Sequence, residues 1–272
     1  MSTASRATDA AAPGTSAPAD PSLFVQSLAR GLAVMEAFDA EHRELTLSQA
    51  AARAGLSRAS ARRLLHTLVE LGYASTDGST FALTPRVLGF GWSYLSGQPF
   101  PELALAVLRR LSEQLGESAS AAELDGTDVV YVQRVETKRI MRVDIKLGTR
   151  FPAAWTSMGR VLLAGTDRAS WEPLLEASLP SAPPSAKVTD VAELVDLLEA
   201  VTASGYCVID QELEPGLRSV AVPVRGPSGR VEHALNVSLR SAEDQSAERA
   251  GERVLPALLA AAAELEAALG RR

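Results

Sequence analysis

The stretch from Thr46 to Gly72 constrains the fold most strongly, because its residues specify where two short helices begin and end. The run 46–49, Thr-Leu-Ser-Gln, has the form of a capping box and predicts a helix through Arg53. Gly55 ends that helix, and Ser57 caps a second one that continues to about residue 71 and is terminated by Gly72. A helical stripe precedes the pair, formed by Leu28, Leu32, Met35 and Phe38. Two short helices around a tight glycine turn are typical of a helix-turn-helix.

The second of these helices has two chemically different sides. At 100° per residue, the apolar side is expected in the core and consists of Ala61, Leu64, Leu65, Leu68 and Leu71. The opposite side carries Arg58, Ala59, Arg62, Arg63 and His66. Exposed arginines at this place suit a helix that lies in the major groove, although a merely solvated basic face is the alternative. The candidate DNA contacts of the pair are Thr46, Ser48, Ser57, Arg58, Ala59, Ser60, Arg62, Arg63 and His66.

A hairpin is predicted directly after these helices. The runs 73–76 and 80–83 favour strands, and Asp77-Gly78-Ser79 between them is a strong turn signal. Helices followed by such a hairpin form a winged helix, whose tip would offer Thr76, Ser79 and Thr80 to phosphates. The sequence therefore predicts that residues 23–84 bind double-stranded DNA.

A further helix is predicted from Thr84-Pro85, with threonine as cap and proline at the first helical position. Its apolar residues are Val87, Leu88, Phe90, Trp92 and Leu95. A helix surrounded by water is not expected to carry this many large apolar side chains. We expect residues 85–98 to be a linker helix that packs on a second copy, with burial against its own domain as the alternative.

The remainder, 99–272, mixes both element types. Strands are expected at 118–124, 128–135, 140–147, 205–209, 219–225 and 231–239. Helices are expected at 101–115, 157–164, 168–177, 190–204 and 243–269, the last kinked at Pro256. Hairpins with helices grouped between them predict an α+β domain with a central antiparallel sheet. Residues 1–22, rich in Ala, Ser and Pro, are expected to be a disordered tail.

Three polar features of this domain are candidate binding elements. After a loop at 148–155, Thr156 or Ser157 caps a helix whose free N–H groups suit a carboxylate, although most caps are only structural. A second polar loop, 212–219, enters an apolar strand. Asn236 and Ser238 share one face of the last strand and line a pocket only if that face points inward.

Composition excludes several other classes. The net charge is −6, but residues 24–95 hold seven Lys/Arg against six Asp/Glu, so their placement matters more than their number. Cys207 is the only cysteine, and no secretory signal, apolar membrane span, phosphate-binding glycine loop or metal-ligand cluster is evident, which indicates a cytoplasmic protein without a cofactor. None of the three histidines has a nucleophile at motif spacing, so we expect no catalysis.

The blocks VQSLARGLAVMEAF, LTLSQAAARAGLSRASARRLLHTLVELGY, LTPRVLGFG, GTRFPAAWTSMGRVLLAG, DQELEPGLRSVAVPV and ALNVS resemble the IclR family across residues 24–270. The first and last blocks are similar to its Pca/Pob-type branch, which regulates aromatic catabolism. The resemblance implies a GAF-like effector domain, a homodimer or a dimer of dimers, and an aromatic-acid effector such as 4-hydroxybenzoate or protocatechuate. A short keto or hydroxy acid, such as pyruvate or glyoxylate, is the alternative.

The resemblance also implies which residues contact the effector: Thr156, Ser157, Met158, Asp210, Val220, Pro223, Asn236 and Ser238. Some relatives have Cys and Ser where this chain has Pro223 and Asn236, so their pocket chemistry does not transfer directly. We add Met141 and Trp155 as candidates for an aromatic-lined wall.

Overall fold

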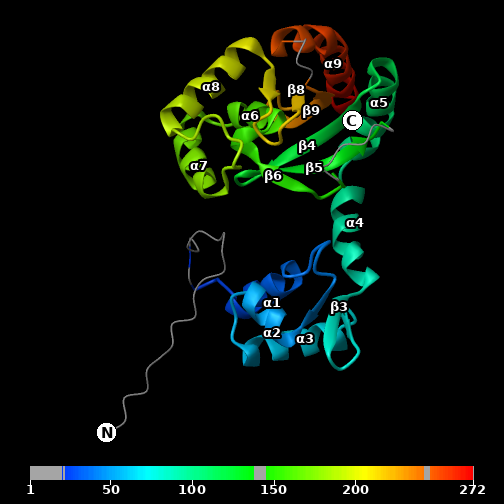
Figure 1. The fold of residues 1–272 in the computed structure, drawn as a ribbon. Helices are drawn as coiled ribbons and strands as arrows, with labels where there is room; N and C mark the ends of the chain where they lie inside the picture. The colour runs from blue at the N-terminus through cyan, green and yellow to red at the C-terminus, as the bar shows by residue number, and fades with distance from the viewer. Residues whose placement is uncertain (1–19, 21, 138–144, 242–245, 272) are drawn as a thin grey trace. The chain divides into compact units, whose positions relative to one another are not determined.

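The computed structural model describes residue 20 and residues 22–137, 145–241 and 246–271. The chain divides into two compact units between Tyr94 and Leu95 (Figure 1). Residues 1–19 and 21 of the predicted tail lie outside the described residues. Among the helices that are described, none combines the length and the apolar character needed to cross a membrane.

The N-terminal unit has the predicted winged helix-turn-helix fold. Its elements are α1 (Gln26–Glu36), β1 (Glu44–Thr46), α2 (Leu47–Arg53), α3 (Arg58–Glu70), β2 (Ala74–Thr76) and β3 (Thr80–Leu83). The capping box at Thr46 and Gln49 is present, and Ser57 caps α3. The strands form an antiparallel sheet in the order β1-β3-β2. The core contains Val34, Leu45, Ala50, Leu65 and Phe81.

Three apolar residues expected in this core are exposed. Leu28 and Leu32 are 62% and 50% exposed, because α1 turns Val34 inward instead. Leu71 is 53% exposed, because it is the C-cap of α3 and no longer follows the buried side of the helix. The short strand β1 was not predicted; its Leu45 is buried opposite Phe81 of β3.

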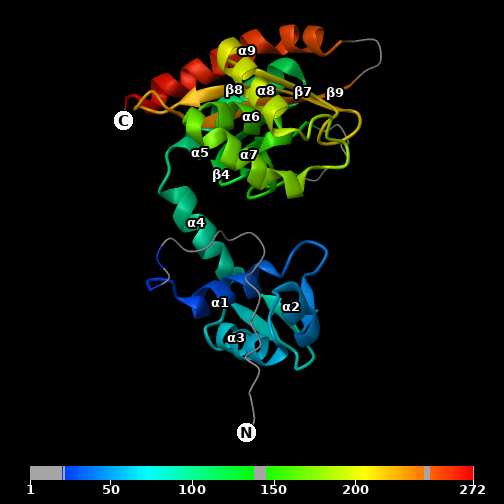
Figure 2. The ribbon, with the colours of Figure 1, turned by 90° about the vertical axis from the view of Figure 1, so that its left-hand side faces the viewer.

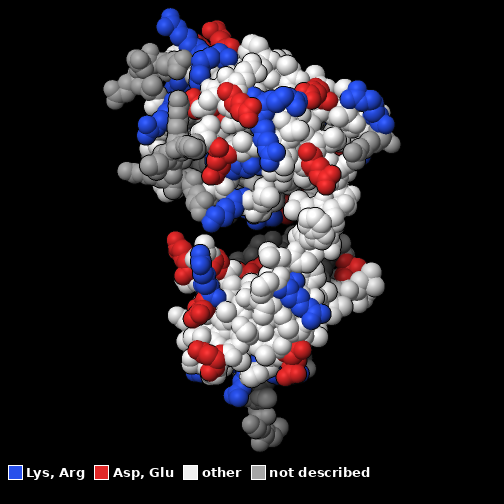
Figure 3. Space-filling model, turned by 90° about the vertical axis from the view of Figure 1, so that its right-hand side faces the viewer, with Lys and Arg blue, Asp and Glu red and all other residues white. Residues whose placement is uncertain are grey.

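The linker element starts with a 3-10 turn, Pro85–Val87, and continues as α4 (Leu88–Ser96). The alternative that its apolar residues are buried in their own domain is wrong: no residue of α4 is buried, and Leu88 and Trp92 are each 70% exposed. Phe90 stacks on Tyr73, with ring centroids 5.3 Å apart, yet remains 58% exposed. α4 carries no charged residue, and the surface over it in Figure 3 is accordingly white.

The C-terminal unit is built on a six-stranded antiparallel sheet in the order β6-β5-β4-β9-β8-β7. The strands are β4 (Ser118–Asp125), β5 (Asp128–Val135), β6 (Arg150–Pro152), β7 (Cys207–Asp210), β8 (Leu217–Arg225) and β9 (Val231–Arg240). α5 (Phe100–Leu115) and α9 (Ala247–Leu269) contact one face of the sheet, while α6 (Ser157–Ala164) contacts the other (Figures 1 and 2). α7 (Trp171–Ser178) and α8 (Val191–Ser204) pack around α6.

Strand alternation assigns each side chain of the sheet to one of two cores. Leu235, Val237 and Leu239 of β9 belong to the core under α5 and α9. The intervening Ala234 belongs to the core under α6, so Asn236 and Ser238 face that side as well. The polar pair therefore points inward, which the sequence left open.

Some boundaries differ from the predicted ones. Of the expected strand 140–147, residues 140–144 lie outside the described residues and residues 145–147 are not in a strand. The three-residue strand β6 was not predicted. α9 runs from Ala247 to Leu269 through Pro256 without interruption, so the proline does not end it.

Candidate DNA-contacting helix and effector cavity

The solvent-facing side of α3 is the predicted one. Arg58, Ala59, Arg62, Arg63 and His66 are all exposed, while Ala61, Leu65 and Leu68 are buried. Within the part of the chain that the structure describes, no hydrogen bond or ion pair engages the three guanidinium groups. These groups are therefore available to a partner.

Two of the other candidate residues of this unit, Thr46 and Ser57, cap helices. The Thr46 hydroxyl donates to the Gln49 side chain at 2.8 Å, and the Ser57 hydroxyl accepts from the Ser60 amide at 3.2 Å. Ser48 is exposed on α2, and Ser60 is half-buried. The Thr46 and Ser57 side chains therefore fix the first turns of α2 and α3.

The wing tip is organised by Asp77. Its carboxylate accepts from the amides and hydroxyls of Ser79 and Thr80, which holds the pKa of Asp77 well below its usual range, the Thr80 amide contributing most. The Thr76 hydroxyl donates to the Thr80 carbonyl at 2.6 Å. The hydroxyls expected to bond phosphate are thus already used inside the turn, beside a permanent negative charge.

A cavity lies in the C-terminal unit between the start of α6 and the sheet. Its walls come from five parts of the chain: Tyr131, Ile145, Trp155, Thr156, Ser157, Met158, Ile209, Leu213, Leu217, Ser219, Asn236 and Ser238. Its free volume is about 10 Å³, room for one water molecule. The lining is mostly apolar with a few neutral polar groups, as is common for small-molecule sites.

The start of α6 presents backbone donors to this cavity. Thr156 is the N-cap and accepts from the Gly159 amide at 3.0 Å. Among the described residues, no hydrogen bond engages the amides of Ser157 and Met158. Gly159 lets the helix approach the preceding turn, because a Cβ there would lie 2.1 Å from the Ala153 carbonyl oxygen.

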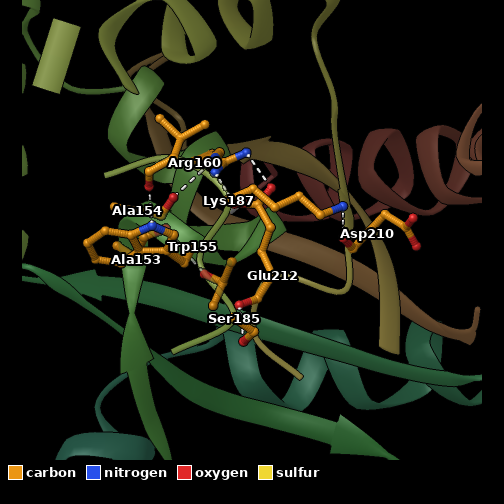
Figure 4. Close-up of polar contacts among 10 residues, drawn as sticks. Ala153, Ala154, Trp155, Arg160, Ser185, Lys187, Asp210 and Glu212 are labelled. Atoms are coloured by element: carbon orange, nitrogen blue, oxygen red, sulfur yellow. Dashed lines mark hydrogen bonds and ion pairs between the residues drawn. The ribbon is translucent and has the colours of Figure 1, made fainter. Parts of the chain in front are cut away.

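A buried ion pair holds this helix against the loop that follows β7 (Figure 4). Arg160 is 4% exposed and Glu212 7%; their charged groups meet at 2.7 Å, and Arg160 also donates to the Ala154 carbonyl. The Ser185 hydroxyl donates to the carbonyl of Glu212, and the Lys187 ammonium donates to that of Asp210. The loop that carries the lining residue Leu213 is therefore fixed from two sides.

Six of the predicted effector contacts line the cavity together: Trp155, Thr156, Ser157, Met158, Asn236 and Ser238. Val220 does not, because strand alternation turns it into the core under α5 and α9, and its neighbour Ser219 lines the cavity instead. Asp210 pairs with Arg218 at 2.8 Å, which lowers the pKa of Asp210, and it lies outside the lining. Pro223 is also outside it. Met141 lies outside the described residues.

Sequence reasoning missed Tyr131, Ile145, Ile209, Leu213, Leu217 and Ser219. Ser219 shows a signal, since it has the strand parity that pairs it with Ser238 across β8 and β9. Tyr131 is an isolated aromatic residue in an apolar strand and offers no local signal.

Both parts of the chain match known protein families. Residues 27–78 match the IclR helix-turn-helix domain, and residues 92–267 match the C-terminal domain of bacterial IclR transcriptional regulators. The chain belongs to the IclR family. It is 46% identical to the Pca regulon regulatory protein of Pseudomonas putida over 89% of this chain and 83% of that protein.

Two further relatives are similar to most of this chain. The p-hydroxybenzoate hydroxylase transcriptional activator of Acinetobacter baylyi is 39% identical, over 78% of this chain and 80% of that protein. A crystal structure of the transcriptional regulator RHA06195 from Rhodococcus sp. RHA1 shares 47% identity and a TM-score of 0.74, covering 91% of this chain and 99% of that one. The Pseudomonas and Acinetobacter relatives support the Pca/Pob-type branch.

This IclR protein is accordingly a DNA-binding transcription regulator and not an enzyme. Its cysteine agrees with that role. Cys207 is 5% exposed, and burial raises the pKa of its thiol to about 12, so it has no thiolate for nucleophilic chemistry.

Replacing Glu212 by Leu should destabilise the C-terminal unit by about 3–5 kcal/mol, because it leaves the buried Arg160 charge without a partner. Denaturant unfolding measures the loss. The double variant Arg160→Met, Glu212→Leu should regain a large part of it. Glu199→Leu, which removes the exposed partner of Arg168, is the control and should change stability by less than about 1 kcal/mol. A Glu212→Leu loss as small as that of the control would contradict a stabilising role for the buried pair.

Proposed function

We propose that this IclR regulator senses a small aromatic acid in the α6 cavity and that the bound acid controls operator affinity. The observation that carries the proposal is the composition of the cavity. Aromatic and thioether side chains, Trp155 and Met158, lie beside free helix N–H groups and neutral polar residues. The names of the Pca and p-hydroxybenzoate relatives support the same ligand class.

The chemistry of a hydroxybenzoate matches these walls. Its carboxylate suits the amides of Ser157 and Met158 at the helix start, where the helix dipole favours a negative charge. Its ring suits Trp155, Met158 and Leu217, and its phenol suits the polar residues of β9, Asn236 and Ser238. On β8 the residues that line the cavity are Leu217 and Ser219, not Val220.

A short keto or hydroxy acid is the second candidate, and the free volume of about 10 Å³ favours it. A benzene ring needs the walls to move apart, whereas a two- or three-carbon acid needs a smaller displacement. Both candidate ligands carry a carboxylate, but only the aromatic acid also carries a large apolar ring.

Calorimetric titration of the full chain separates them. We expect 4-hydroxybenzoate or protocatechuate to bind and to change the mobility shift of DNA from the promoter beside its own gene. Vanillate, β-ketoadipate, pyruvate and glyoxylate serve as comparison ligands. Binding of pyruvate or glyoxylate alone would remove the aromatic assignment.

We further propose that α3 is the recognition helix, with Arg58, Arg62 and Arg63 directed to base edges or phosphates. The support is their exposure and the absence of internal partners among the described residues. Because operator DNA lies in the bacterial cytoplasm, we propose that the protein works there.

Arg58→Ala and Arg62→Ala should each weaken operator binding by roughly 5- to 150-fold, the cost of about 1–3 kcal/mol for one lost contact. An arginine that contacts phosphate should also reduce the slope of log affinity against log salt by about 1. Mobility shifts at several salt concentrations measure both effects. The exposed Arg109 of α5 supplies a charge-matched control, Arg109→Ala, which should leave operator binding unchanged. Unaltered binding in both α3 variants would mean that another surface contacts the DNA.

We also propose that α4 pairs with a second copy of the chain. Leu88, Phe90, Trp92 and Tyr94 are 48–70% exposed within nine residues that carry no charge. Apolar surface of this density is characteristic of protein interfaces. A homodimer, or a dimer of dimers, would cover it.

Trp92→Glu should therefore weaken the dimer by at least about tenfold, because a charge replaces a large apolar contact. Sedimentation velocity over a concentration series measures the change. Leu71→Glu, at an exposed leucine of the same unit, is the control and should leave the association state unchanged. Equal association of wild type and Trp92→Glu would place the interface elsewhere.

A further inference from the structure

Two polar side chains of the α6 cavity carry an oxygen atom that none of the described residues hydrogen-bonds. Tyr131 lies on β5 and Asn236 on β9, and both line the cavity. They are 4% and 3% exposed. Polar groups buried to this degree are normally hydrogen-bonded, and an unpaired one is costly.

The Tyr131 hydroxyl is a permanent donor. No hydrogen bond within the described ranges of the chain engages it, although its ring packs edge-on against Phe151 with centroids 5.7 Å apart. Burial raises the pKa of Tyr131 to about 12, so the phenol keeps its proton at every physiological pH. It can therefore donate to a neutral or anionic oxygen.

Asn236 contributes the complementary group. Its Oδ1 is buried and has no hydrogen-bond partner among the described residues. Its backbone is fixed in mid-sheet, opposite Ser120 of β4 on one side and Ala221 of β8 on the other. No hydrogen bond from either neighbour reaches Oδ1, so it is an unpaired acceptor on a residue that lines the cavity.

We propose that Tyr131 and Asn236 together recognise a hydroxyl group on the ligand, which donates to Asn236 Oδ1 and accepts from the Tyr131 hydroxyl. A hydroxyl is both donor and acceptor, so one such group satisfies both residues. The inference rests on the proposed aromatic-acid function and narrows it to hydroxylated acids. A ligand without the hydroxyl leaves the buried Asn236 oxygen unpaired and covers the Tyr131 hydroxyl without giving it a partner, and sites of this kind reject such analogues strongly.

Tyr131 then determines specificity in addition to packing. A purely structural Tyr131 would affect all ligands of the cavity alike, or none. A hydroxyl-recognising Tyr131 affects only ligands that carry the hydroxyl. The ratio of two affinities therefore distinguishes the roles.

Calorimetry with 4-hydroxybenzoate and benzoate on the full chain tests this. Wild type should prefer 4-hydroxybenzoate by at least about tenfold. Tyr131→Phe should weaken 4-hydroxybenzoate by roughly 3- to 10-fold and leave benzoate unchanged or tighter. Asn236→Leu should shift the ratio in the same direction, and the double variant should lose less than the product of the single losses, because both residues bond one group.

Tyr206→Phe is the matched control, since it removes a hydroxyl from a half-buried tyrosine of the same domain outside the cavity lining. Thermal unfolding shows whether each variant remains folded. If wild type binds 4-hydroxybenzoate and Tyr131→Phe keeps the wild-type ratio, the inference is overturned while the proposed function stands. If wild type binds neither aromatic acid, both the proposed function and this inference are wrong.

Discussion

The binding half of this molecule depends on the alternation of side chains across a sheet that is covered on both faces. Helices α5 and α9 contact one face and α6 the other, so successive residues in the middle of β8 and β9 enter alternate cores. A shift of one residue exchanges the faces. Ser219 lines the cavity and Val220 supports the opposite core for this reason alone. The polar residues Asn236 and Ser238 reach the cavity while their apolar neighbours stabilise the packing of α5 and α9.

The position of α6 on that face is fixed by specific close contacts in addition to its buried apolar residues. Gly159 permits the approach to Ala153, and the Arg160–Glu212 pair holds the helix against the loop after β7. The Trp155 indole donates to the Val188 carbonyl at 2.8 Å, so the turn before the helix is anchored as well. A helix start held in this way keeps its free amides in place before a ligand arrives, which reduces the ordering cost of binding.

The sequence predicted the helix starts and the hairpin, which local side chains determine. It did not predict the part of the cavity lining that depends on the pairing of distant strands. Thr46, Gln49 and Ser57 define helix starts by their own side chains, so the boundaries of α2 and α3 were correct. Asp77 and Gly78 likewise determine the hairpin. In contrast, Tyr131 reaches the cavity through the pairing of β5 with β4, opposite Ala122, which no local pattern reveals. Asp210 was expected in the cavity from the resemblance to the IclR family, but it pairs with Arg218 and lies outside the lining.

The same sheet connects the cavity to the beginning of α5. β9 carries Asn236 and Ser238, and its His233 stacks on Phe100, the first residue of α5, with ring centroids 3.5 Å apart and planes 2° from parallel. α5 begins shortly after α4 ends, so Phe100 lies close in sequence to the segment that joins the two units. A ligand can change operator affinity only by as much as it prefers one arrangement of that segment over another. Tight binding without such a preference shifts nothing, so under the proposed function the strength of regulation depends on that preference and not on the affinity of the cavity alone.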